Sequence, residues 1–495
     1  MEKPKKRDLS YLSKSLFLRG LQCPKSLYLY KTQPDLRDPV SDAQEAVFQA
    51  GTEVGITAQG LFPGGKVIPY DGMSLDDQKK LTQAEIAAGT PVLYEPAFQF
   101  DKVFIKADIL KKVGEGWDLY EVKGSTGIKD VYLNDIALQY YVLKNSGLPI
   151  RKAYLVYLNN QYVRKGTLDL DQLFLFEEVT QIAIEREGLV RDEIGRLRGT
   201  LAGGLPDIDI GEHCSDPYPC DFQGNCWAHI PEYSVLDLTR RGANPWDLYR
   251  QGFLRLEDVP KGCLSPVQLV QVEAYLDQKE FVNAEGIREF LSSLWDPLYF
   301  LDFETFMTAI PIYDGTKPYQ QVPYQYSLHS LQGDHSDLGH SEFLAPPNTD
   351  PRRPLVEKLV GDIPDKACVL AYNASFEKTI LNQLADWFPE HRQSLEGIID
   401  NLRDLAVPFR SRDIYRWEMK GSYSQKMVLP ALIPEMMYQG MEISDGGMAM
   451  EGYFRMCEVQ DMAEIEKVRQ ALLEYCRMDT LGMVRLYEKL REVAC

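Results

Sequence analysis

Two carboxylates stand one residue apart in the apolar stretch YFLDFETF, residues 299–306. Successive side chains of an extended chain point to opposite faces, so Asp302 and Glu304 are expected to share one face of a strand. Like charges this close and half buried force one carboxylate to take up a proton unless a cation lies between them. The pair therefore indicates a metal ion, and a strand end with two solvated acids is the alternative.

Two further polar pairs follow at helical spacing. In AYNASFEKTIL, Asn373 and Glu377 are four residues apart just after an expected strand, and in EYCRMDTLGM the pair is Tyr475 and Asp479 on the last long helix. Residues four apart lie on one face of a helix. Each pair alone is also typical of an ordinary polar helix surface.

In this order the three motifs resemble those of the DEDD exonucleases of the ribonuclease H-like fold, in the subgroup with a tyrosine in its third motif. The resemblance covers most of residues 291–495 and implies a 3′–5′ exonuclease. Asp302, Glu304 and Asp479 would hold two divalent ions, Mg²⁺ or Mn²⁺, for which oxygen ligands are suited. Tyr475 would orient the attacking water.

The second motif departs from that family, which usually has aspartate where Glu377 stands. We expect Glu377 to reach a metal through its longer arm or through a water molecule. Asp404, in DNLRDLAVPF, is an alternative acid for the same role.

A second group of charged residues lies in FIKADILKKVGEGWDLYEVKGSTG, residues 104–127. Asp108 is expected on one strand, and Glu121 and Lys123 on one face of the next. Two acids and a lysine can hold one metal and present an ammonium group to a scissile phosphate or its water. A surface hairpin with ordinary charges is the alternative. Gln139 is expected to open the helix that follows.

These features resemble the PD-(D/E)xK nucleases of the RecB type, and more closely the CRISPR-associated members whose core is clasped by an iron–sulfur cluster. The resemblance assigns the catalytic roles to four side chains, Asp108, Glu121, Lys123 and Gln139. The first two would be the metal ligands. Many relatives carry a helical histidine in their first motif, and FQAGTEVGITAQGLFPGG has none. Glu53 or Glu95 is expected to take its place.

The cysteines fit the same resemblance. Nine cysteines, an odd number, argue against a disulfide framework. Clasped relatives use one cysteine before the nuclease core and three after it, and here Cys23 precedes the core while Cys214, Cys220 and Cys226 follow it. The resemblance implies a 4Fe-4S cluster on these four thiolates. A zinc ion and free buried thiols are the alternatives.

The elements that must position these residues follow from hydrophobic periodicity. Strands are expected at 91–100, 103–113, 116–125, 151–159, 297–306, 324–331 and 367–373. Helices are expected at 133–147, 175–201, 375–388 and 463–493.

A chain of 495 residues is expected to form two or three domains. Strands and helices alternate over residues 1–232, short helices and connectors fill 233–290, and a second α/β unit covers 291–495. We therefore expect an α/β protein, with a PD-(D/E)xK restriction-endonuclease-like domain followed by a ribonuclease H-like mixed-sheet domain.

The net charge of −19 opposes binding of nucleic acid by bulk electrostatics. Metal-dependent nucleases nevertheless concentrate acids at their sites, and the basic segment 403–426 is either a phosphate-binding strip or a solvated face. No run of about 18 apolar residues occurs, which argues against a membrane span. Arg19 interrupts the one stretch that imitates a signal peptide, so a cytoplasmic location is expected.

The whole chain resembles a bacterial family that fuses an iron–sulfur-clasped RecB-type nuclease to a ribonuclease H-like exonuclease. The expected function is a metal-dependent nuclease that acts on single-stranded DNA or RNA ends in repair, recombination or defence. A catalytically decayed nucleic-acid-binding or scaffold protein is one alternative, and an RNA-processing exonuclease is another, because both folds act on either polymer. The sequence gives no information on protein partners, which stay unknown.

Overall fold

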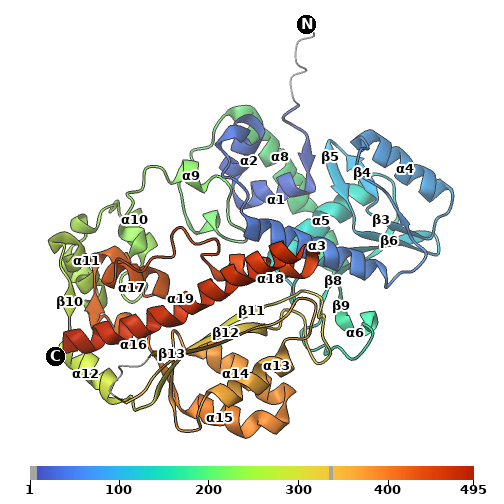
Figure 1. Cartoon of the computed structure of the whole chain (residues 1–495). Helices are drawn as coiled ribbons and strands as arrows, with labels where there is room; N and C mark the ends of the chain where they lie inside the picture. The colour runs from blue at the N-terminus through green and yellow to red at the C-terminus, as the bar shows by residue number, and fades with distance from the viewer. Residues whose placement is uncertain (1–7, 334–337, 495) are drawn as a thin grey trace. The chain divides into compact units, whose positions relative to one another are not determined.

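The computed structural model describes residues 8–333 and 338–494 (Figure 1). They form two compact units, the first from Met1–His229 with Thr308–Gln320 and the second from Ile230–Met307 with Gln321–Cys495. Both units combine helices with mixed sheets, which confirms the predicted α/β class. In the described part of the chain, no helix has the length together with the apolar character that crossing a bilayer requires.

A six-stranded sheet forms the centre of the first unit. Its strands, in spatial order, are β2 (Lys66–Val67), β3 (Val92–Tyr94), β6 (Ile109–Val113), β7 (Gly116–Lys123), β8 (Ile150–Leu158) and β9 (Phe174–Glu178). Strand β7 runs antiparallel to β6 and parallel to β8. A smaller sheet has the order β1 (Leu12–Ser13), β5 (Val103–Lys106) and β4 (Ala97–Phe100).

Helices pack around these two sheets. They are α1 (Lys14–Gln22), α2 (Pro24–Thr32), α3 (Asp42–Gln59), α4 (Leu75–Ala87), α5 (Asp130–Asn145), α6 (Leu170–Leu173), α7 (Thr180–Glu185), α8 (Glu187–Gly203) and α9 (Gln223–Cys226). Leu119 of β7 packs in the core that contains α5 and α8, whereas Tyr120 and Val122 pack in the core that contains α3. The alternation therefore turns Glu121 and Lys123 toward α5.

Two predicted strands of this unit are each divided in two. The predicted strand 91–100 breaks at Glu95, which has a φ of 57°, and at Pro96, which has no N–H to donate. The predicted strand 103–113 breaks opposite it, and Ala107 N donates to Pro96 O at 3.1 Å. Both breaks occur because the chain passes there between the small sheet and the large one.

Two helix predictions were also wrong in their bounds. The segment 175–201 begins as strand β9, because Phe174–Glu178 pairs antiparallel with β8, and continues as the two helices α7 and α8. Gln139 does not open a helix but lies well inside α5, which begins at Asp130.

A five-stranded mixed sheet forms the centre of the second unit, in the order β13 (Leu338–Leu344), β12 (Val322–Leu331), β11 (Leu298–Phe306), β14 (Cys368–Ala371) and β15 (Leu402–Asp404). Strand β11 is antiparallel to β12 and parallel to β14. A short pair joins β10 (Phe281–Val282) to β16 (Ile414–Tyr415). The helices are α10 (Pro245–Arg250), α11 (Pro266–Asp277), α12 (Ala284–Ser292), α13 (Arg352–Asp362), α14 (Ser375–Trp387), α15 (Arg392–Asp400), α16 (Val407–Arg410), α17 (Gln425–Leu432), α18 (Gly446–Glu458) and α19 (Met462–Ala494).

The two faces of this sheet bury different helices. Leu301 and Phe303 pack in a core with residues of α13, α14 and α15. Helices α18 and α19 contact β11 from the other face, and α19 lies along the sheet (Figure 1). In α19 the buried positions recur every three or four residues, at Val468, Leu472, Cys476 and Asp479. Asp302 and Glu304 therefore face the buried side of α19.

The segment Thr308–Gln320, between β11 and β12, packs in the first unit. Ala309 and Ile310 join the apolar cluster under α3. Arg164 Nη1 donates to the carbonyl oxygens of Pro311 at 2.9 Å and Ile312 at 3.0 Å. The Tyr319 hydroxyl donates to Gly124 O at 2.5 Å, directly after Lys123.

Candidate metal centres

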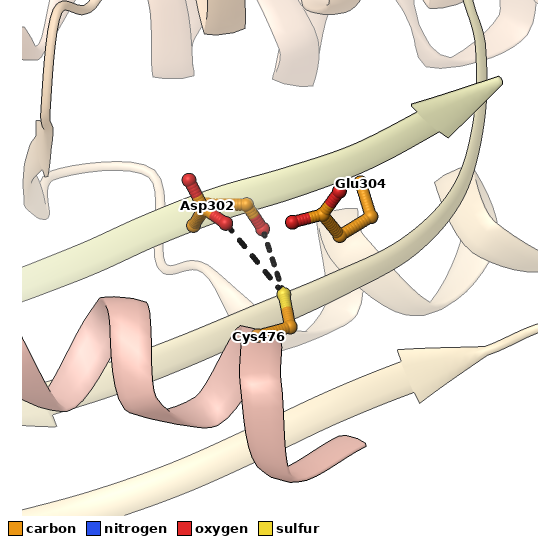
Figure 2. Close-up of side chains that lie close together, drawn as sticks. All are labelled: Asp302, Glu304 and Cys476. Atoms are coloured by element: carbon orange, nitrogen blue, oxygen red, sulfur yellow. Dashed lines mark hydrogen bonds between the residues drawn. The ribbon is translucent and has the colours of Figure 1, made fainter. Parts of the chain in front are cut away.

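The C-terminal centre lies between β11 and α19 (Figure 2). Asp302, Glu304 and Cys476 each offer a ligand atom within 4.8 Å of the other two. The Cys476 thiol contacts Asp302 Oδ2 at 3.7 Å. Burial raises the pKa of Cys476 well above its usual value, and the neighbouring carboxylates raise it further. The thiol is therefore protonated and donates to Asp302.

Four carboxylates repel one another in this centre. Burial raises the pKa of Asp302 well above its usual value, and the charges of its acidic neighbours, Asp479 first, raise it further. Burial likewise raises the pKa of Glu304 to about 8 and that of Asp479 to about 6. Such shifts are expected where several acids are buried close together.

Glu377, at the N-terminal end of α14, completes the four. Its side chain is only 2% exposed, and its Oε2 has no hydrogen-bond partner. Its charge acts on Asp302, so it belongs to the same group. A buried carboxylate oxygen without a partner is costly in a protein interior, and a cation would satisfy it.

Asp404, the alternative acid, is already engaged. Its Oδ2 accepts from Arg410 Nη1 at 2.9 Å, and its Oδ1 accepts from the backbone N–H groups of Asn373 at 3.0 Å and Ala406 at 2.9 Å. Asp404 fixes the turn that precedes α14.

Tyr475 and Asp479 lie on the buried face of α19 as their spacing predicts. Two residues that the motifs do not include also act here. The Tyr438 hydroxyl donates to Asp479 Oδ1 at 2.6 Å, and the charge of Lys426 lowers the pKa of Glu304 and Asp479 against the effect of burial. Lys426 Nζ itself donates to Ser444 O at 2.8 Å. Only the end of the basic segment 403–426 pointed to Lys426, and no sequence signal pointed to Tyr438.

Glu377 should make the metal-free protein less stable as the pH rises. Burial raises the pKa of Glu377 from 4.5 to about 8 in the folded protein. Below pH 4.5 its carboxyl is protonated in both the folded and the unfolded protein. Between pH 4.5 and about 8 only the unfolded protein releases the proton. The free energy of unfolding should then fall by about 1.4 kcal/mol per pH unit in this window. In EDTA, the melting temperature of Glu377→Gln relative to wild type should therefore rise steadily from about pH 5 to about pH 8.

Glu390→Gln, at an exposed glutamate paired with Arg353, is the matched control. Its melting temperature should change with pH in the same way as that of wild type. If the melting temperature of Glu377→Gln also changes with pH as that of wild type does, Glu377 has no buried, unpaired carboxylate.

The N-terminal centre lies between β7 and α5. Lys123 Nζ is 2.7 Å from Glu121 Oε1 and 2.5 Å from Asp135 Oδ2. Gln139 Nε2 donates to Glu121 Oε2 at 2.7 Å and to Asp135 Oδ1 at 2.9 Å. Asp108 lies in the break before β6 and not on a strand as predicted, and its Oδ2 accepts from Val122 N at 2.7 Å. Because the chain leaves the strand conformation between β5 and β6, the Asp108 side chain can reach the backbone of β7.

Two charged residues of this centre were not predicted. Asp135 stands four residues before Gln139 on α5, a spacing that could have revealed it. Lys14, the first residue of α1, places Nζ 2.9 Å from Glu121 Oε1. Its distance in the chain from Glu121 gave no signal.

Neither acid proposed for the missing histidine is a free ligand of the centre. Glu95 acts on the pKa of Asp108, but its carboxylate is paired with Lys106 at 2.9 Å. Glu53 is exposed on α3.

The four cysteines Cys23, Cys214, Cys220 and Cys226 line one pocket. Hydrogen bonds hold the two parts of the chain together around it. Gln22 Nε2 donates to His213 O at 2.8 Å, and Arg19 Nη2 donates to Asp221 Oδ2 at 3.0 Å. Burial raises the pKa of the Cys23 thiol, and the charges of Cys220 and Cys214 add to this rise.

Several basic side chains of the segment 403–426 are paired with acids of the same chain. Arg410 pairs with Asp404, Arg416 with Glu418, and Lys420 with Glu232. Arg412 is buried and donates to the carbonyl oxygens of Ser422 and Gly421. These contacts favour a structural role for the segment over a phosphate-binding strip.

Residues 299–424 match the family model described as domain of unknown function (DUF2779). The match contains Asp302, Glu304 and Glu377 and ends before Tyr475 and Asp479.

The chain is also similar to three curated proteins. It is 26% identical over 233 residues to the "Uncharacterized protein MG366 homolog" of Mycoplasma pneumoniae and 24% identical over 233 residues to "Uncharacterized protein MG366" of Mycoplasma genitalium, with 43% of this chain and 35% of each relative covered. It is 29% identical over 147 residues to "Uncharacterized protein UU173" of Ureaplasma parvum, with 28% of this chain and 21% of the relative covered. The chain thus spans about a third of the length of the first two relatives.

Proposed function

We propose that this chain is a metal-dependent nuclease that hydrolyses phosphodiester bonds of nucleic acid. One observation carries the proposal: four carboxylates meet in the second unit, one of them with a buried oxygen that has no partner. Such a group needs divalent cations to be stable, and carboxylate oxygens are the ligands that Mg²⁺ and Mn²⁺ prefer.

In this proposal Asp302, Glu304 and Asp479 hold two divalent ions, and Glu377 supports them directly or through water. The bound ions would supply the charge that activates a water molecule and stabilises the leaving 3′ oxygen of the scissile phosphodiester. The chain's own residues fix the ligands: Tyr438 donates to Asp479, and Gln425 Nε2 donates to Asp479 O at 2.6 Å.

Tyr475 has the role of orienting the attacking water. Burial raises the pKa of its hydroxyl far above neutrality, and the charge of Asp479 raises it further. The phenol therefore keeps its proton and acts as a hydrogen-bond partner, not as a phenolate base.

The deciding assay uses end-labelled single- and double-stranded DNA and RNA with Mg²⁺ or Mn²⁺. Wild type, Asp302→Ala and Lys123→Ala are compared in parallel. Digestion of RNA alone would support the alternative of an RNA-processing exonuclease. Digestion of DNA would support a role in repair, recombination or defence.

We further propose that the first unit is a RecB-type nuclease module clasped by a 4Fe-4S cluster. The four cysteines line one pocket, yet in the described residues only Asp302, Glu304 and Cys476 have ligand atoms that all lie within 4.8 Å of one another. Tetrahedral zinc would hold thiolates about 3.8 Å apart, as its Zn–S bonds of about 2.3 Å require. The wider spacing favours the larger cluster, and iron–sulfur chemistry and free thiols both favour a cytoplasmic location.

Protein purified without oxygen should be brown and contain about four iron and four sulfide per chain, as expected for a Cys₄-bound cubane. Cys214→Ser should lose most of the iron. Cys263→Ser, at an exposed cysteine outside the pocket, is the matched control and should keep it. Cys368, Cys457, Cys476 and Cys495 should also be dispensable for the colour, although Cys495 lies outside the described residues. Colourless protein with one zinc per chain would exclude the iron–sulfur cluster but would still support a metal site on the four cysteines.

One observation favours a second candidate function for the first unit, nucleic-acid binding without cleavage. Its acids Glu121 and Asp135 are already paired with lysines. An absence of cleavage in Asp302→Ala protein under any metal would support this function.

A further inference from the structure

Lys14 places a second ammonium group in the N-terminal centre. Its Nζ lies 2.9 Å from Glu121 Oε1 and 3.7 Å from Asp135 Oδ1. Lys123 contacts the same two carboxylates at 2.7 and 2.5 Å. With Asp108, the centre therefore sets three acids against two lysines, and the pairs with Lys14 and Lys123 neutralise most of its negative charge.

The C-terminal centre has a different balance. Four carboxylates repel one another there, and the ammonium of Lys426, which acts on two of them, is bonded to Ser444 O at 2.8 Å. The C-terminal centre thus has one ammonium that is bonded elsewhere, whereas the N-terminal centre has two that contact its acids. Two centres with such different charge should differ in their affinity for divalent metal.

Of the two lysines, Lys14 is held less tightly. Its side chain is 27% exposed against 18% for Lys123, and its contact with Asp135 is longer, 3.7 Å against 2.5 Å. Lys14 also comes from another element, the first residue of α1, whose N-terminus is capped by Ser13. Its flexible four-carbon stem can withdraw the ammonium while α1 stays in place.

We propose that Lys14 is a built-in cation of the N-terminal centre, and that a divalent metal binds there only by displacing the Lys14 ammonium from Glu121 and Asp135. Lys123 stays in place for the chemistry. The inference rests on the proposed function of this centre and deepens it, because it sets a requirement for high metal concentration. The displaced ammonium keeps its proton and moves to solvent.

The test measures Mn²⁺ binding directly, by the EPR signal of free Mn²⁺, in full-length Asp302→Ala protein. Removing the Lys14 charge should tighten binding by about tenfold or more in Lys14→Gln. Lys14→Arg keeps the charge and should keep the weak binding. Lys80→Gln removes a lysine with a 76% exposed side chain from the same unit and should change nothing. Adding Glu121→Gln to Lys14→Gln should abolish the gain.

Unchanged or weaker Mn²⁺ binding in Lys14→Gln would overturn the proposal, because Lys14 would then not compete with metal. Thermal unfolding covers the case in which Lys14→Gln folds poorly. Mn²⁺ should raise the melting temperature of Lys14→Gln by more than that of its parent, and an equal or smaller rise would also overturn the proposal. Neither readout requires cleavage, so a failure of the nuclease assay would count against the proposed function and not against this inference.

Discussion

Asp302→Ala protein is expected to lose nearly all release of nucleotides from 3′ ends of single strands, with the rate lowered by about a thousandfold or more. Asp302 and Asp479 lie in one buried group of carboxylates, so Asp479→Ala should have a similar effect. Tyr475→Phe should lower the rate by about ten- to a hundredfold, because the phenol orients water and does not bind the metal. The measurement is the initial rate on 3′- and 5′-labelled strands with Mg²⁺ or Mn²⁺.

Asp386→Ala is the matched control for these variants. Asp386 lies on α14 like Glu377, but its side chain is exposed and pairs with Arg392 at the surface. Such a pair contributes little to stability, so the rate should stay at the wild-type level. The assignment is wrong if Asp302→Ala protein digests 3′ ends as fast as Asp386→Ala protein does.

The sequence predicted the parts of the C-terminal centre that depend on local periodicity. A period of two turned Asp302 and Glu304 to one side of β11, and a period near 3.6 put Tyr475 and Asp479 on one face of α19. Tyr438 could not be predicted in this way. It lies between α17 and α18, outside any periodic element, and reaches Asp479 only through tertiary packing.

In the first unit the same rule worked within β7 and failed at its neighbours. Glu121 and Lys123 share a face, but Asp108 lies in a break that exists because the chain changes sheets. Gln139 was expected to open a helix, whereas the apolar periodicity predicted that helix from residue 133 and α5 begins at Asp130. Lys14 comes from a distant part of the chain, and only the folded structure brings it to Glu121.

These differences give the two centres distinct expected behaviour. In the C-terminal centre the carboxylates need metal to remove their mutual repulsion, so metal should stabilise the second unit strongly near neutral pH. In the N-terminal centre the lysines already supply positive charge, so metal should add little stability. A single chain would therefore show two classes of metal dependence.

Lys123→Ala is expected to remove the cleavage that persists in Asp302→Ala protein at high Mn²⁺, by about a hundredfold or more, since it deletes the ammonium that would face a scissile phosphate or its water. Binding of Mn²⁺ should not weaken in this variant, because Lys123 pairs with Glu121 and Asp135, the two carboxylates that a metal would have to contact, and so opposes metal. Loss of cleavage together with retained metal binding separates a catalytic lysine from a structural one.

Lys112→Ala is the control, because Lys112 is exposed on the neighbouring strand β6. It should leave both cleavage and metal binding at the level of the Asp302→Ala parent. Residual cleavage that is indifferent to Lys123→Ala would refute the catalytic assignment of the N-terminal centre. Cleavage absent from the Asp302→Ala parent with every metal would instead support a first unit that binds nucleic acid without cutting it and delivers it to the C-terminal centre.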